Sequence, residues 1–171
     1  PDINPDQSNF ADAVIDCMVP GQTQSYAVIN MTSAYADDAK KTLRGIKLNK
    51  TDNIITIRDE VEGYSALEAW WFMHTRAEIT LFDAGKTAKL ELGGQTVYAV
   101  LNSSVQDAVF TVMDAVPLPS SPQNPNQNPN TGIRKLAIHI TDSAKFDITV
   151  VIAPSEELAK SVTPSAIDEW N

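Results

Sequence analysis

The chain has 171 residues, of which 43% are hydrophobic and 20% charged, and its formal net charge is −9. This length suits one domain with a proper hydrophobic core. The acidic balance, without a basic stripe, argues against a general nucleic-acid or anionic-membrane binder. No apolar run is long enough to cross a membrane as a helix, and the single Cys17 excludes an internal disulfide. Because the sequence opens on Pro1 without a signal peptide, we expect a processed or excised piece of a longer protein.

The sequence of the N-terminal part predicts short strands separated by turns. Residues 1–9 are a polar lead-in. Residues 10–19 fit a helix or a strand, with strand preferred, and a Pro-Gly pair ends them. Residues 25–32 predict a strand, and residues 33–41 predict a short helical turn with Ser33 as a candidate cap.

Residues 53–75 hold the densest apolar run of the chain. They predict two strands, 54–61 and 66–75, joined by a turn at Glu62-Gly63. The second strand carries two of the three tryptophans and ends near His74. A histidine that could act chemically therefore lies at the end of the most apolar stretch of the sequence.

Alternation of apolar and polar residues continues downstream, which indicates further strands. Turn signals separate them at residues 83–86, at Gly93-Gly94 and at Asp142-Ser143. Residues 117–130 contain half of the prolines and predict an exposed loop inserted between strands, and residues 155–171 predict a polar tail with a helical turn near 156–161. The remaining predicted strands are 77–82, 88–92, 95–101, 108–116, 133–141 and 146–152.

These elements predict an all-β fold: an antiparallel β-sandwich of two stacked sheets, with about 9–11 strands and little helix. Residues 1–171 form one such domain in this interpretation. No strand–helix–strand alternation occurs, so a Rossmann-type or barrel α/β fold is excluded.

Both histidines have a functional and a structural interpretation. His74 would serve as a metal ligand or general acid/base, because imidazole changes charge near neutral pH, or simply as a strand-end residue bonded to a neighbour. His139 alternates with Leu136, Ile138 and Ile140, so we expect it on the opposite face, toward solvent or another domain.

Adjacent residues in a strand point to opposite faces, which constrains two pairs. Asp59 and Glu60 therefore cannot converge as a pair of catalytic carboxylates, and we expect one of them to cap the turn or to pair with Arg44 or Arg58. Trp70 and Trp71 also diverge: one belongs to the core, and the other to a second buried face, a domain interface or a sugar-stacking surface.

Tyr35 and Arg44 are the pair best suited to an acidic sugar. A phenolate would act as a base while the guanidinium binds a carboxylate; the structural alternative is a half-buried tyrosine at a bend. The sequence has no phosphate-binding glycine loop, no Gly-x-Ser-x-Gly, no His-Glu-x-x-His and no EF-hand spacing.

Three segments in this order are similar to a known family. They are Asn-Met-Thr-Ser-Ala-Tyr at 30–35, Arg-Gly-Ile at 44–46, and Ile-Arg-Asp-Glu-Val at 57–61 followed by Trp-Phe-Met-His-Thr at 71–75. The order resembles the C-terminal β-domain of the heparinase II/III-like polysaccharide lyases, over roughly residues 25–154.

The resemblance implies an α/α toroid domain N-terminal to this β-sandwich, with an acidic polysaccharide bound between the two and cleaved by β-elimination. It implies catalytic or cleft-lining roles for Tyr35 and His74 and substrate-binding roles for Arg44 and Trp71. Some family members hold a structural zinc with a histidine and an aspartate. His74 matches that histidine, but Asn30 replaces the aspartate and is a poorer ligand, so we expect no metal and no other cofactor.

The leading functional hypothesis is a lyase module that supports the substrate cleft and is inactive alone, in a bacterial periplasmic or secreted protein acting on a glycosaminoglycan-like substrate. The alternative is a stand-alone carbohydrate-binding or cell-surface interaction sandwich. A third hypothesis is a scaffold domain whose fold carries no activity.

Overall fold

The computed structural model describes residues 11–121 and 125–170. Within them the all-β prediction is confirmed, and nine strands fall in the predicted range. In these residues no helix is long and apolar enough to cross a membrane. The elements are β1 (Val14–Val19), β2 (Gln24–Asn30), η1 (Thr32–Tyr35), β3 (Ala39–Asn49), β4 (Ile54–Thr75), β5 (Glu78–Phe82), η2 (Asp83–Gly85), β6 (Thr87–Leu92), β7 (Gln95–Ser103), β8 (Phe110–Asp114), β9 (Arg134–Ala153), α1 (Glu156–Ser161) and η3 (Ile167–Glu169), where η marks a 3-10 helix.

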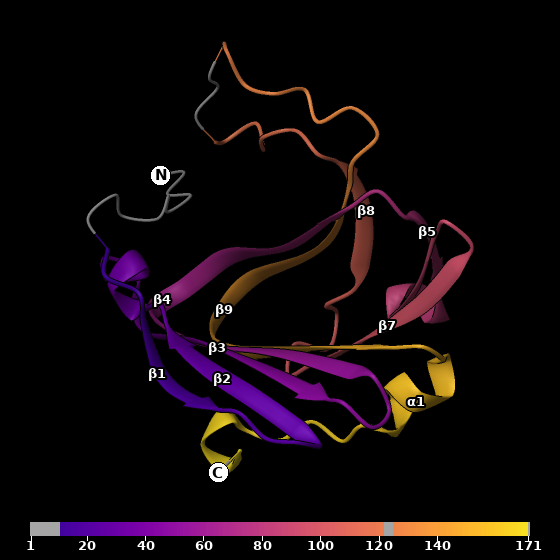
Figure 1. The fold of residues 1–171 in the computed structure, drawn as a ribbon. Helices are drawn as coiled ribbons and strands as arrows, with labels where there is room; N and C mark the ends of the chain where they lie inside the picture. Colours follow the sequence, from indigo (N-terminus) through magenta and orange to yellow (C-terminus); the bar gives the residue numbers. More distant parts are fainter. Residues whose placement is uncertain (1–10, 122–124, 171) are drawn as a thin grey trace.

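The two predicted sheets are two layers of one folded sheet. Its strands follow the order β1-β2-β3-β4-β9-β7-β6-β5, all antiparallel, and β8 pairs with β9 beside this path. β4 and β9 curve through both layers (Figure 1). The large layer contains β1–β3, β5–β7 and one half each of β4 and β9, and the small layer contains β8 with the other two halves.

β4 is one continuous strand, so the predicted turn at Glu62-Gly63 is wrong. The register jumps from Glu62–Lys145 to Leu67–Ser143, so β4 carries four residues where β9 carries one. Such a β-bulge bends a strand without ending it. Gly63 is required there because a Cβ would lie 2.6 Å from a backbone carbonyl oxygen.

The predicted turn at Asp142-Ser143 is wrong for the same reason. β9 continues from Arg134 to Ala153, and Asp142 adopts a positive φ of 53° within it. A short polar side chain tolerates this conformation as a single residue. The turn-like residues of β4 and β9 therefore mark the bend between the layers.

The predicted helical turn at residues 33–41 is shorter than expected. η1 ends at Tyr35 and β3 already begins at Ala39. Ser33 lies inside η1 and is not its cap; its hydroxyl donates to the carbonyl of Asp12 at 2.9 Å. The hairpin at Gly93-Gly94 and the helical turn at Glu156–Ser161 are confirmed.

The main core lies between the layers. The alternate apolar residues of each strand point inward, as the period-2 pattern requires. The small layer contributes Trp71, Phe110, Leu136, Ile138 and Ile140, and the large layer contributes Leu90, Leu101, Ile148 and Val150.

Residues 155–170, here called the C-terminal segment, cover the outer face of the large layer instead of forming a polar tail. α1 is capped by Ser155, whose hydroxyl accepts from the Leu158 N–H at 3.2 Å, and buries Ala159 in a second core with Val100 and Val151. Trp170 is only 5% exposed. A Cβ on Gly45 would lie 2.7 Å from its ring, so the indole packs directly on the backbone of β3.

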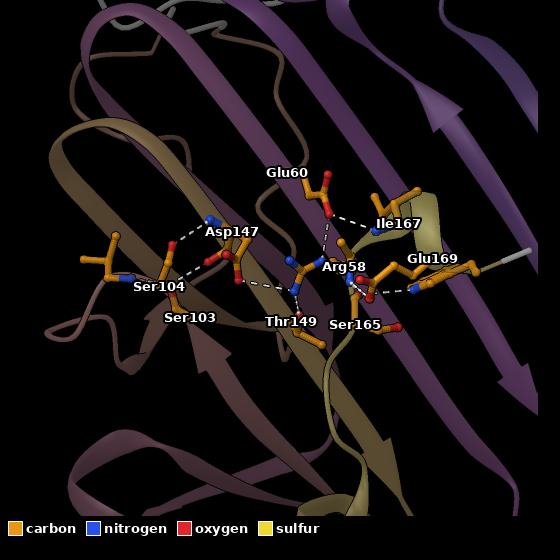
Figure 2. A network of polar contacts seen from close by, with 12 residues as sticks. Arg58, Glu60, Ser103, Ser104, Asp147, Thr149, Ser165, Ile167 and Glu169 are labelled. Atoms are coloured by element: carbon orange, nitrogen blue, oxygen red, sulfur yellow. Dashed lines mark hydrogen bonds and ion pairs between the residues drawn. The ribbon is translucent and has the colours of Figure 1, made fainter.

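A polar network joins this segment to β4 and β9 (Figure 2). Glu60 accepts from Arg58 Nε at 3.0 Å and from the Ile167 N–H at 2.9 Å, and Arg58 donates to Thr149 Oγ1 at 2.9 Å. Burial raises the pKa of Glu60, but the hydrogen bonds from Ile167, Arg58 and Lys41 outweigh it and the pKa is lowered overall. The predicted pairing of one acid with Arg58 is confirmed.

Candidate functional site

A pocket of about 320 Å³ opens on the flank of the sandwich. At this flank the large layer extends beyond β4 to β3, β2 and β1, whereas the small layer ends at β4. The floor comes from β3 and the first half of β4, one wall comes from η1 and the residues after it, and the other comes from the second half of β4 and the segment after β8. The lining residues include Tyr35, Asp38, Thr42, Arg44, Asp59, Glu68, Trp70, Trp71 and Phe72.

An ion pair forms the polar centre of the pocket floor. Arg44 and Asp59 are cross-strand neighbours in register, and the carboxylate accepts from Arg44 Nε at 2.7 Å and Nη2 at 2.9 Å. The hydrogen bonds that Arg44 donates to Asp59 raise the pKa of Arg44, and Tyr35 is close enough to add to this rise. The predicted pairing of Asp59 with Arg44 is confirmed. A ligand carboxylate would have to bind Nη1 or displace Asp59.

The pocket is more acidic than basic. Asp38, Asp59 and Glu68 line it together with Arg44, whose charge Asp59 already neutralises. Beside them lies the Thr42 hydroxyl, a buried oxygen that has no hydrogen-bond partner in the described part of the chain. Taken alone, this surface does not favour a polyanionic ligand.

Trp70 and Trp71 diverge as predicted. Trp71 is 6% exposed and belongs to the main core, so it reaches the pocket only as a buried wall residue. Trp70 lies on the outer face of the small layer. Its ring stacks on His139 with centroids 3.8 Å apart and on Phe72 with centroids 5.6 Å apart.

This stack extends at both ends. His139 lies 2.9 Å from a carboxylate oxygen of Glu68. At the other end, Lys135 Nζ lies 4.3 Å from the Phe72 ring centroid and donates to the carbonyl of Val116 at 2.7 Å. Burial lowers the pKa of Lys135. The Trp70 ring is therefore already stacked on two side chains of the protein, His139 and Phe72.

His74 does not join Tyr35, Arg44 and Trp71 at the pocket. It is exposed near the end of β4, opposite Lys135 and two residues beyond Phe72. Asn30 lies in the large layer, where its side-chain oxygen accepts from the Thr32 N–H at 3.1 Å. Among residues 11–121 and 125–170, no group of three or more His, Cys, Asp or Glu side chains is placed to hold a metal ion.

No protein-family model and no curated protein sequence matches the chain. Solved structures do. The chain is similar to a heparinase III with methylated lysines, at a TM-score of 0.60 and 12% identity over 85% of this chain. It is also similar to a mutant of the heparan sulfate lyase HepC from Pedobacter heparinus, at a TM-score of 0.52 and 7% identity over 82% of this chain. At these identities the likeness shows the fold, and the resemblance read from the sequence agrees with it.

The chain covers only 22% and 21% of those two chains. It therefore corresponds in fold to about a fifth of a heparinase-like lyase. The pocket gathers three of the four site residues that the sequence predicted, Tyr35, Arg44 and Trp71.

Sequence reasoning missed Asp38, Glu68 and Thr42 at the pocket. Glu68 was detectable in principle, because it shares a strand face with Trp70 and lies near His139. Asp38 and Thr42 carried no signal, since their place depends on how η1 packs over β3.

Proposed function

We propose that this chain is the β-sandwich module of a polysaccharide lyase that cleaves an acidic polysaccharide by β-elimination, and that it supports the substrate cleft without being active alone. The observation that carries the proposal is the placement of Tyr35 and Arg44 on one pocket, in a fold shared with part of a heparinase III. The fold alone would not suffice, because a fold can host unrelated functions.

The chemistry fits these two side chains. In β-elimination a base removes the proton from the carbon beside the uronate carboxylate, a double bond forms, the bond to the glycosidic oxygen breaks, and an acid protonates that oxygen. Arg44 would stabilise the negative charge that spreads onto the carboxylate. Tyr35 would move a proton as the base or as the acid that protonates the leaving oxygen.

A second domain is required by this proposal, for an electrostatic reason. The pocket has one arginine, already paired, against three carboxyl groups, and the whole chain carries a formal charge of −9. Basic groups that attract a polyanion must therefore come from elsewhere. An N-terminal toroid domain would supply them and close the cleft, and exposed His74 would reach the substrate only if that domain extends the cleft along β4.

The stand-alone carbohydrate-binding alternative has less support. A sugar-stacking platform needs an accessible ring face, and the Trp70 ring is already stacked on His139 and Phe72. Trp71 is buried.

The test compares the 171-residue chain with a longer chain that includes the second domain, using heparin, heparan sulfate and alginate as substrates. We expect no retention on heparin and no ultraviolet absorbance of unsaturated uronate with the short chain, and product with the longer one. In the longer chain, Tyr35→Phe should lower kcat by about 10²-fold or more, whereas Tyr64→Phe, at an exposed tyrosine outside the pocket lining, should not.

Two outcomes would contradict the proposal. One is release of unsaturated product by the 171-residue chain alone. The other is full activity of the Tyr35→Phe variant in a correctly folded longer chain.

A further inference from the structure

An apolar surface continues from the pocket across the inner face of the large layer. Arg44, Ile46 and Leu48 are alternate residues of β3 and share one face. Residues directly opposite in register point the same way, so Ile55 and Ile57 of β4 extend this surface on one side. The pocket and the apolar surface are therefore neighbouring parts of one sheet face.

The same register carries the surface to the edge of the sheet. Ile29 and Ala27 of β2 lie opposite Arg44 and Ile46, and they are followed in β1 by Ile15 and Met18. We call the five exposed members the open face: Ile15 (63% exposed), Met18 (70%), Ile46 (38%), Leu48 (37%) and Ile55 (38%).

The opposite side is covered at β2 and β3, whereas Val14 and Val19 of β1 on that side are 50% and 40% exposed. Trp170 of the C-terminal segment packs on Gly45, and Lys47 Nζ lies 4.2 Å from the centroid of the indole ring. Val28 on that side is 8% exposed. Among residues 11–121 and 125–170, the open face is thus an apolar sheet surface without the cover that β2 and β3 have on their reverse side, and such patches mark interaction sites.

We propose that the open face is the docking surface for the second domain of the longer chain, an inference that rests on the proposed function. Size favours a tethered partner over a free one. Five partly exposed side chains present on the order of a few hundred Å², below the roughly 800 Å² per partner of a stable free complex. Contacts between domains of one chain are smaller, because the tether supplies a high effective concentration.

The likeness in fold supports the same occupant. The chain matches about a fifth of each lyase, so most of a comparable protein lies outside it. A domain seated on the open face would also stand beside Arg44 and Tyr35. Docking there would bring its groups to the rim of the pocket, where the proposed cleft needs them.

Met18 provides a direct probe of the contact. It is the most exposed member of the open face, and dilute hydrogen peroxide oxidises accessible methionines to the sulfoxide. A reference methionine is introduced by Leu92→Met, at a site 57% exposed on the hairpin of β6 and β7. Peptide mass spectrometry then gives both oxidation rates in the 171-residue chain and in the longer chain.

We expect Met18 to be oxidised at least ten times more slowly in the longer chain, with the reference rate unchanged. The triple substitution Ile46→Thr, Leu48→Thr and Ile55→Thr keeps β-propensity and should restore fast oxidation of Met18. The control variant Phe82→Thr and Val97→Thr, at apolar sites 42% and 36% exposed away from the open face, keeps the reference methionine at position 92 and should not.

Equal oxidation of Met18 in both chains would overturn the docking surface, and in a longer chain that is an active lyase it would leave the proposed function standing. Protection of Met18 in a longer chain without lyase activity would support the docking surface and overturn the proposed function. Protection in the 171-residue chain together with sedimentation as a dimer would make a second copy the occupant and overturn the proposal.

Discussion

The two faces of the large layer at β1–β4 differ in what covers them. On one face Trp170 packs on Gly45, Val28 is buried, and the polar network of Arg58 and Glu60 bonds the C-terminal segment to the sheet. The other face holds the Arg44–Asp59 pair and the open face. Both faces follow the same alternation of side chains, so alternation alone does not decide which one becomes core. The C-terminal segment stabilises the covered face, and both of the sites proposed above lie on the other face.

Removing the indole that covers one face should have the largest effect on stability. Trp170→Ala deletes a 5% exposed indole that packs on β3 and contacts Tyr26 edge-on. We expect the free energy of unfolding to fall by about 3–5 kcal/mol, the usual cost of truncating a buried aromatic side chain. Urea denaturation measures it.

The control for that experiment is Leu92→Ala, at a side chain 57% exposed on a hairpin, which should cost less than about 1 kcal/mol. An equally small loss of unfolding free energy for Trp170→Ala would mean that the C-terminal segment adds little to the stability of the fold. The two faces would then not differ in their contribution to stability.

The partly buried carboxylate of Glu60, which bonds the C-terminal segment, gives a smaller effect that depends on pH. Glu60 has a pKa below its ordinary value of 4.5, so its contribution is fully present above pH 4.5 and is lost as the pH falls through the folded-state pKa. Glu60→Gln should cost about 1 kcal/mol at pH 7, allowing for solvent screening of a partly exposed group. The gap between wild type and variant should narrow below pH 4.5.

Chemical denaturation across pH 3–7 measures that gap. Glu91→Gln, in an exposed pair with Lys89, is the matched control and should show little difference at any pH. A gap for Glu60→Gln that stays constant below pH 4.5 would show that its carboxylate is not held by Arg58 and Ile167.

Most strands were predictable because alternation and turn residues are local signals. The bend between the layers was not predictable. Gly63 and Asp142 belong to residue types that commonly end strands, but here Gly63 lies at a β-bulge of β4 and Asp142 has a positive φ within β9. Whether such a residue ends a strand or bends it depends on pairing with distant residues. The C-terminal segment was missed for a similar reason, since Trp170 stands alone in a polar stretch and its partner Gly45 is far away in sequence.

The site was predictable in part. The pairing of Arg44 with Asp59 follows from two strands in register, and the separation of Trp70 from Trp71 follows from adjacency alone. The pocket itself needed the fold, because it arises where β4 passes from one layer to the other. His74 illustrates the limit: its position in the sequence suggested the cleft, but Phe72 is closer to the pocket and His74 is exposed beyond it.

Two buried threonines allow the two faces to be compared directly. Thr42 and Thr149 are both buried threonines of the large layer, one on each face. Thr149 Oγ1 accepts from Arg58, whereas the Thr42 hydroxyl has no partner among the described residues. Valine removes the hydroxyl and adds a methyl group of similar size. Thr149→Val should therefore cost about 1–3 kcal/mol, because Arg58 Nη1 loses its acceptor at 2.9 Å and keeps only Asp147 Oδ2 at 3.3 Å.

Thr42→Val removes no hydrogen bond within the protein and should leave the free energy of unfolding unchanged or raise it by up to about 1 kcal/mol. Thermal and urea unfolding of the two variants give the comparison. A loss above about 1 kcal/mol for Thr42→Val would show that the pocket floor is satisfied by bound water. The pocket side of the sheet would then be as fully bonded as the covered side.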